Sequence, residues 1–386
     1  MTVSSDPARQ ANSSAARAPE PPSASEQAVA ARLLDYLRIA LKRPALAYAE
    51  TPARVMGGFE TSIFGFALAG APEPMGGPLI LRLFAQGDDP ERARMEAAIQ
   101  NAVAELGYPA PRVFVAETDT RILGGGFLIM ERMAGHMLTQ EFAGLGRGRS
   151  ARELIGALAR VPAILREFST IMAAAQSRLH QLPVEPLIRA VESAGLPVKP
   201  ITFEGRLERI RLICEEPELA GLRPAVAWLE ANRPPDRRLV ICHCDFQPFN
   251  ILMDGGRVTG VIDWTGVTIG DPALDLGFTL AQIAVAPIEV PAVMQPIFRA
   301  IMNAAGRRYC RAYGRGLALD GKALRYYQVF GCMDQLTWAC EGLVHGYQSR
   351  AFWSASGIAR LVSHIRSLTG IKLAANVIPR VEIRPA

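Results

Sequence analysis

The feature that most constrains the fold is a β-hairpin signal inside a long stretch of helical sequence. Residues 239–242 and 250–253 are short apolar runs on either side of a polar loop, and residues 258–262 form a third run after an Asp-Gly-Gly turn. A tight turn of this kind between apolar runs is typical of two antiparallel strands. We therefore expect a small group of strands here that fixes the loop at residues 243–249.

The N-terminal part of the chain has the pattern of a small sheet. Residues 62–68 and 78–84 read as strands joined by a loop rich in Pro and Gly. A helix is expected to begin at Pro90, and two more short strands follow around Val113 and at residues 127–130. Strands, a helix and further strands in this order predict a small α+β domain.

The remaining sequence is mostly helical, and the chain divides near residue 133. Apolar side chains repeat at helical spacing between residues 161 and 179, and again beyond Pro296. Residues 1–27, rich in Ala, Ser and Pro, are expected to form a disordered tail without a secretory signal. The predicted lobes are residues 28–133 and residues 134–386, so the fold class is α+β with a small β-rich lobe and a larger helical lobe.

Composition excludes several classes of protein. No segment offers the roughly 20 uninterrupted apolar residues of a membrane span. The net charge of +5 is spread over 386 residues with scattered arginines, so we expect no nucleic-acid partner. Six cysteines in a chain of this length do not form a disulfide framework, which favours reduced thiols and a cytoplasmic location.

Three polar residues around the hairpin can carry chemistry together. Asp245 lies in the loop, Asn250 follows five residues later, and Asp263 ends the returning strand. An amide oxygen and a carboxylate from adjacent strands suit Mg²⁺, which prefers oxygen ligands and completes its shell with phosphates and water. Asp245 can then accept a hydrogen bond from a hydroxyl in line with a γ-phosphoryl group. Each residue alone could be a turn residue, but the ordered set is far more specific.

Several further motifs accompany this segment along the chain. They are Gly57-Gly-Phe-Glu-Thr-Ser62, Leu81-Arg-Leu83, Glu96 thirteen residues before Pro109, Met130-Glu-Arg-Met-Ala-Gly135, Leu179-His180, and Gly270-Asp271-Pro-Ala-Leu-Asp275-Leu. With them, roughly residues 50–290 resemble the aminoglycoside phosphotransferase/choline kinase family. That resemblance implies a two-lobed protein-kinase-like fold and a kinase that uses ATP or GTP with Mg²⁺.

The resemblance also implies roles for individual residues of the nucleotide site. Arg82 would reach the ATP phosphates and pair with Glu96, although many relatives have lysine at this position. The residues implied to bind the nucleotide are Gly57, Gly58, Phe59, Thr61, Arg82, Glu96, Met130, Glu131 and Met133.

On the catalytic side, the resemblance makes Asp245 the catalytic aspartate and makes Asn250 and Asp263 the Mg²⁺ ligands. The residues implied to support the catalytic loop are His243, Asp271 and Asp275. His180 is expected to pack in the core. Cys244 stands where the family commonly has Gly, and Phe249 is bulkier than the Gly found in relatives, so both are expected to alter the acceptor-facing side of the loop.

Three functional classes can be compared on these residues. A protein kinase needs a long activation segment, but Asp271 follows Asp263 after only eight positions. A catalytically silent scaffold would lack one of the three polar residues, and all are present. The expected function is therefore phosphoryl transfer from ATP to a hydroxyl of a small molecule, with an aminoglycoside O-phosphotransferase as the alternative.

The charge of the C-terminal region bears on the acceptor. Residues 264–386 contain 13 Arg and Lys against 7 Asp and Glu. A site for a polycationic aminoglycoside needs clustered acids, because an unpaired buried charge is costly. We therefore expect a neutral, lipophilic or anionic hydroxyl acceptor.

Overall fold

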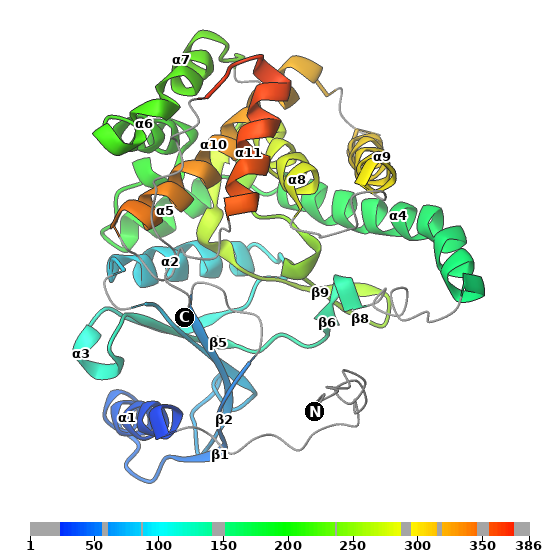
Figure 1. Cartoon of the computed structure of the whole chain (residues 1–386). Helices are drawn as coiled ribbons and strands as arrows, with labels where there is room; N and C mark the ends of the chain where they lie inside the picture. Colours follow the sequence, from blue (N-terminus) through cyan, green and yellow to red (C-terminus); the bar gives the residue numbers. More distant parts are fainter. Residues whose placement is uncertain are drawn as a thin grey trace, which may run out of the picture.

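Five antiparallel strands form one sheet in the N-terminal lobe, in the order β1-β2-β3-β5-β4 (Figure 1). The computed structural model describes residues 24–55, 61–85, 88–140, 151–235, 238–286, 295–314, 319–345 and 355–373. The strands of the sheet are β1 (Ala47–Arg54), β2 (Ser62–Ala69), β3 (Leu79–Leu83), β4 (Val113–Glu117) and β5 (Phe127–Glu131). The expected nucleotide loop at Gly57, Gly58 and Phe59, and residues 1–23 of the expected tail, lie outside the described residues.

Helices cover both faces of this sheet. In β5, Phe127 and Ile129 join the core beneath α1 (Ala24–Ala40), whereas Leu128 and Met130 pack with α2 (Glu91–Glu105). Successive residues of a strand point to opposite faces, and a strand buried on both faces is therefore apolar throughout. The helix expected after Pro90 is confirmed, and a short helix α3 (Thr120–Leu123) joins β4 to β5.

The edge strand β1 is absent from the sequence-based prediction. Its sequence, AYAETPAR, lacks an alternating apolar pattern, and only Pro52 of its residues is fully buried. Charged residues and Pro are typical of edge strands, where one side of the backbone faces no partner. Pairing with β2, and not burial, therefore defines this element.

The C-terminal lobe is mostly helical, as expected. Its α-helices are α4 (Ala151–Leu179), α5 (Glu185–Ser193), α6 (Phe203–Ile213), α7 (Arg223–Ala231), α8 (Pro272–Val285), α9 (Gln295–Tyr313), α10 (Gly321–His345) and α11 (Ala355–Thr369). At the centre, α8 lies against α10 so closely that a Cβ at Gly277 would be 2.6 Å from Tyr327. Glycine at this position lets the two helices touch.

The expected hairpin is confirmed as β8 (Ile251–Asp254) and β9 (Arg257–Val261). The strand before the loop, β7 (Val240–Cys242), pairs elsewhere, with β10 (Thr268–Gly270), which was not anticipated. A two-residue strand, β6 (His136–Met137), adds to the other edge of β8. Asn250 ends a 3-10 turn, η4 (Pro248–Asn250), and a second such turn, η5 (Trp264–Gly266), follows β9. The shorter 3-10 segments η2 (Lys199–Ile201) and η3 (Pro217–Leu222) link the helices around α6.

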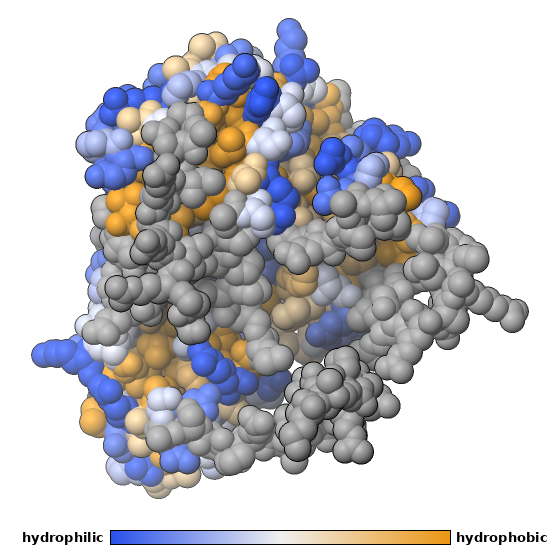
Figure 2. Space-filling model, in the orientation of Figure 1, coloured by the Kyte–Doolittle hydropathy of each residue, from blue (hydrophilic) through white to orange (hydrophobic). Residues whose placement is uncertain are grey.

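Helix α2 joins the two lobes. Figure 1 shows it between the sheet and the helices of the larger lobe. Its side chains Ile99 and Val103 are buried in one cluster with Leu187 and Val191 of α5. Figure 2 shows hydrophilic residues spread over the outer helices, with hydrophobic ones between them. Among the described helices, none has the length and hydropathy of a membrane span.

Candidate active site

Asp275 of α8 fixes the start of the loop that follows β7. Its carboxylate accepts hydrogen bonds from the backbone N–H groups of His243 at 2.9 Å and Cys244 at 2.7 Å. Burial opposes ionisation of this side chain, but the hydrogen bonds from His180 and from the backbone N–H of His243 outweigh burial and hold the pKa of Asp275 below its ordinary value. A buried, ionised carboxylate therefore anchors the loop.

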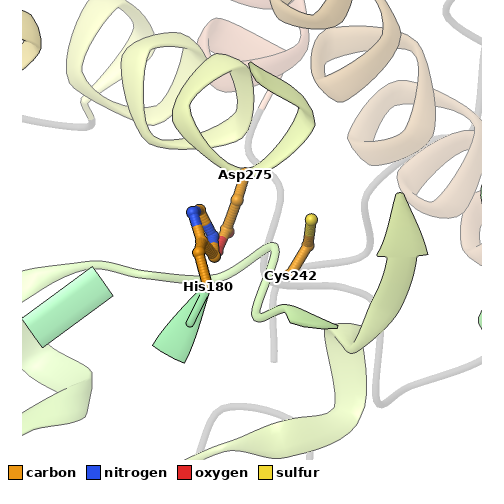
Figure 3. Close-up of side chains that lie close together, drawn as sticks. All are labelled: His180, Cys242 and Asp275. Atoms are coloured by element: carbon orange, nitrogen blue, oxygen red, sulfur yellow. The ribbon is translucent and has the colours of Figure 1, made fainter. Parts of the chain in front are cut away.

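His180 completes this anchor from below, as Figure 3 shows. Its Nε2 lies 2.9 Å from Asp275 Oδ2, and its Nδ1 lies 2.6 Å from the Tyr313 hydroxyl. The thiol of Cys242 is nearby and donates to the carbonyl of Asp271 at 3.5 Å. Although His180, Cys242 and Asp275 lie within 4.8 Å of one another, these bonds engage both imidazole nitrogens and both carboxylate oxygens. The cluster is therefore accounted for as a hydrogen-bonded brace, and His180 lies in the core as expected.

Asp271 acts at the beginning of α8. Its Oδ1 accepts a hydrogen bond from the backbone N–H of Ala273 at 2.8 Å, which is the geometry of a helix N-cap. Of the two acids expected to support the loop, Asp275 contacts the loop backbone directly. Asp271 caps the helix that carries Asp275.

His243 connects the loop with the end of β9. Its Nε2 lies 3.2 Å from the carbonyl oxygen of Ile262, and its Nδ1 accepts from the backbone N–H of Asp245 at 3.3 Å. Burial lowers the pKa of His243. A neutral imidazole with Nε2 protonated satisfies both contacts.

Asp245 is surrounded by side-chain amides. Its Oδ2 accepts from Asn250 Nδ2 at 2.6 Å, and its Oδ1 accepts from Gln282 Nε2 at 2.5 Å. Gln247 Nε2 bridges both oxygens at 2.9 and 3.2 Å. Burial, and then the negative charge of Asp263, raise the pKa of Asp245 to about 7. A carboxylate with such a pKa can act as a base near neutral pH.

Asp263 lies next to Asn250 because the hairpin brings them together. The backbone N–H of Ile262 donates to the carbonyl of Asn250 at 2.9 Å, just beyond the ends of β8 and β9. Asp263 has φ +65°, a left-handed conformation that turns the chain into η5. Burial opposes its ionisation, but Arg82 and a hydrogen bond from Thr265 outweigh burial and lower its pKa.

Arg82 reaches this site from the N-terminal sheet. Its guanidinium donates to Glu96 Oε1 at 2.5 Å, to Thr61 Oγ1 at 3.2 Å and to Asp263 Oδ1 at 3.2 Å. The expected ion pair with Glu96 is therefore present. The contact with Asp263 was not anticipated, and it ties the two lobes together at the site.

Comparison with known proteins shows the family of this chain. The sequence profile of the phosphotransferase enzyme family matches residues 72–319. The chain belongs to this family. It is 28% identical to an aminoglycoside 3'-phosphotransferase of Streptomyces fradiae over 278 residues, 70% of this chain and 90% of that protein. It is 25% identical to human acyl-CoA dehydrogenase family member 11 over 249 residues, which is 61% of this chain but 30% of that protein.

Solved structures show the same kinase-like fold. A complex of aminoglycoside phosphotransferase APH(4)-Ia with AMP-PNP and hygromycin B has a TM-score of 0.50 and 19% identity, and covers 86% of this chain and 99% of that one. A candidate aminoglycoside phosphotransferase from Ralstonia eutropha has a TM-score of 0.51 and 17% identity, with 88% and 95% covered. The predicted two-lobed fold is confirmed.

The expected hinge of this phosphotransferase lies between β5 and β6. Met130 is buried beneath α2, where its sulfur accepts from Gln100, and Glu131 Oε2 accepts from the backbone N–H of Arg112 at 3.4 Å. Met133 lies against β9, where a Cβ at Gly260 would be 3.2 Å from it. The segment after β5 therefore contacts β9, which pairs with β8.

The expectation for Cys244 was wrong. Its side chain is buried in the core of the C-terminal lobe and does not form part of an acceptor-facing surface. Its backbone has φ +58°, a conformation that glycine adopts without strain, which explains why Gly suits this position. Phe249, by contrast, is 56% exposed beside Asn250, and its effect on the acceptor-facing side of the loop stays a prediction.

Two polar contacts in or near the candidate site escaped the sequence analysis. Gln282 contacts Asp245 from α8, seven residues after Asp275 on the same helix face. Arg206 of α6 is bound to Asp334 of α10 and donates to the carbonyl of Gly266 at 2.7 Å, just after Asp263. The spacing Asp275, Thr279 and Gln282 could have indicated the first, whereas only tertiary structure brings Arg206 here.

Proposed function

We propose that this chain is an ATP-dependent kinase that transfers the γ-phosphoryl group to a hydroxyl of a small molecule. The observation that carries the proposal is the convergence of four side chains from three parts of the chain: Asp245 and Asn250 from the loop between β7 and β8, Asp263 from the end of β9, and Arg82 from β3. Hydrogen bonds join Asp245 to Asn250 and Arg82 to Asp263. A base, two oxygen ligands and a guanidinium in one place are what phosphoryl transfer requires.

The metal ligands we propose are Asn250 and Asp263. Asn250 turns its Nδ2 toward Asp245, which leaves its Oδ1 for a cation, and Asp263 contributes an ionised carboxylate. Such an oxygen set fits Mg²⁺. When bound, Mg²⁺ would bridge and neutralise the ATP phosphates. Glu96 holds Arg82 toward the same place, so that its guanidinium can bind phosphate oxygens in a fork.

Asp245 is the proposed catalytic residue. It would accept the hydrogen bond of the acceptor hydroxyl and orient its oxygen toward the phosphorus. His243, Asp271 and Asp275 position the loop that carries it. On the other side of the nucleotide, the proposed contacts are the loop at Gly57, Gly58, Phe59 and Thr61, and the hinge at Met130, Glu131 and Met133.

For the acceptor, we propose a hydroxyl compound that is not a polycation. The excess of basic over acidic residues beyond Trp264 supports this, since Asp271 and Asp275 are already engaged in structure. The aminoglycoside phosphotransferase of Streptomyces fradiae supports the alternative, an antibiotic-modifying enzyme. All six cysteines are free thiols, which suits the cytoplasm as the proposed compartment.

The test is Asp245→Asn, with turnover and nucleotide binding measured on the same samples. Loss of a positioned base is expected to lower turnover by about 10²–10⁴-fold, while calorimetry gives an unchanged affinity for Mg·ATP. A panel of hydroxyl compounds, with kanamycin as the polycationic member, identifies the acceptor class. Near-normal turnover of the variant refutes the assignment of Asp245, and efficient phosphorylation of kanamycin favours the alternative.

A further inference from the structure

One face of α8 contacts the catalytic loop three times. Asp275 binds the N–H groups of His243 and Cys244, and the Thr279 hydroxyl donates to the carbonyl of Phe246 at 3.3 Å. One further turn along the helix, Gln282 donates to the carboxylate of Asp245 itself at 2.5 Å. The first two contacts hold the loop backbone, whereas the third occupies the reacting group.

The hydrogen-bonding positions of Asp245 are filled in this arrangement. A carboxylate has about four lone-pair sites, and four N–H contacts reach it from Asn250, Gln247 and Gln282. An acceptor hydroxyl can therefore bind Asp245 well only after one of these amides has moved away.

Gln282 is the amide whose departure the geometry favours. Asn250 makes a second bond to the Asp245 carbonyl at 3.0 Å, and Gln247 belongs to the same loop as Asp245. Gln282, by contrast, reaches Asp245 from α8 through a flexible side chain. Its Oε1 is closed off from solvent and has no hydrogen-bond partner among the described residues. A buried acceptor without a donor is unfavourable, so a ligand that supplies a donor would draw this amide toward itself.

We propose that Gln282 is a specificity-determining residue for the acceptor. Its amide occupies the position that the reacting hydroxyl would take beside Asp245, and when an acceptor binds it receives a hydrogen bond from a second neutral donor adjacent to that hydroxyl. The acceptors selected are then 1,2-diols or hydroxy-amides, and simple monohydric alcohols are disfavoured. This inference rests on the proposed kinase function.

The experiment compares matched alcohols as acceptor probes, with ADP release from Mg·ATP as the readout. The pairs are glycerol with 1-propanol, and cis-1,2-cyclohexanediol with cyclohexanol, each at equal concentration. The wild type is expected to turn over each diol faster than its monohydric partner. Gln282→Met keeps the length of the side chain but loses its amide, so it is expected to reduce this preference about tenfold, which corresponds to the loss of one good hydrogen bond. Gln328→Met is the matched control, because the Gln328 side chain donates to the Leu324 carbonyl of its own helix, α10, and lies outside the site.

A second measurement does not depend on turnover. The side-chain NH₂ signals of Gln282 in a ¹⁵N-labelled sample, assigned from their loss in Gln282→Met, are expected to shift with cis-1,2-cyclohexanediol and to stay in place with cyclohexanol. The inference is overturned if the wild type turns over a diol and its monohydric partner at equal rates. It is also overturned if Gln282→Met keeps the full preference for the diol. Failure of the wild type to bind Mg·ATP in the same sample instead overturns the proposed function.

Discussion

Arg82 of the N-terminal sheet donates to Asp263 of the C-terminal lobe at 3.2 Å, across 181 positions of sequence. The same guanidinium donates to Glu96 of α2 and to Thr61, which immediately precedes β2. One side chain therefore connects the sheet, the lobe-joining helix and the proposed metal site. The arrangement uses the planar fork of arginine, which a lysine ammonium cannot reproduce.

Replacement of Arg82 should therefore weaken nucleotide binding, by an amount that depends on the new side chain. Arg82→Lys keeps one charge but cannot reach its three partners at once, so the affinity for Mg·ATP is expected to fall about tenfold, and Arg82→Met about a hundredfold. Calorimetric titration with Mg·ATP measures both. Arg121→Met, on the exposed surface of α3, is the control and should bind as the wild type. Wild-type affinity in Arg82→Met would remove this residue from the nucleotide site.

The proposed metal ligands differ in charge, and their variants should differ accordingly. Asp263→Ala is expected to abolish the tightening of ATP binding by Mg²⁺, because the phosphates lose their bridging cation. Asn250→Ala removes a neutral ligand and should have a milder effect. Titrations of ATP at several Mg²⁺ concentrations distinguish the two. An unchanged Mg²⁺ dependence in Asp263→Ala contradicts the assignment.

Activity should depend on pH through Asp245. Burial and the charge of Asp263 raise its pKa to about 7 in the free enzyme, and only the ionised carboxylate can accept the hydroxyl proton. We expect kcat/KM to rise about tenfold per pH unit below that pKa and to level off above it. Measurement between about pH 5.5 and about pH 8.5 covers the transition. A profile that is flat, or that falls with increasing pH, is incompatible with this role.

Asp275 should matter for stability as well as for activity. Asp275→Asn removes the buried charge that His180 and two backbone N–H groups share, and is expected to lower the free energy of unfolding by about 3 kcal/mol. Because the folded-state pKa of Asp275 is lowered, its contribution is present above the ordinary carboxyl pKa and is lost as the pH falls through the folded value. Denaturant unfolding at several pH values tests both statements. The N-cap variant Asp271→Ala, at about 1 kcal/mol, provides the comparison.

The close approach of α8 and α10 offers a test by addition of one carbon. In Gly277→Ala the new Cβ would meet the backbone and Cβ of Tyr327 at 2.6 Å. Overpacking of this kind is expected to cost about 1–3 kcal/mol in the free energy of unfolding. Gly321→Ala, where no atom lies within 4 Å of the added carbon, should be close to neutral. Equal stability of the two variants would show that the helices can separate without cost.

The sequence predicted those helices, strands and turns that are encoded by neighbouring residues. Strand and helix patterns located β2, β3, α2 and β5, and the hairpin placed Asn250 beside Asp263, because register and turn geometry are encoded over a few residues. The sequence pattern did not predict β1, whose polar side chains lie at a sheet edge, or the pairing of β7 with β10. Long-range contacts such as those from Arg82 to Asp263 and from Arg206 to Gly266 depend on how the lobes and helices pack, which no short motif records.

The placement of Asp275, Thr279 and Gln282 on one face of α8 has a consequence for protein engineering. The rest of the helix surface, with Gly277, Phe278 and Ala281, is buried against α10. A one-residue shift in the register of that packing would rotate all three polar contacts by about 100° away from the loop. Libraries that aim at a new acceptor should therefore vary Gln282 and its surroundings while the buried side of α8 stays fixed. A mutation in that core would then lower activity by moving Asp275, Thr279 and Gln282, without itself contacting the reacting groups.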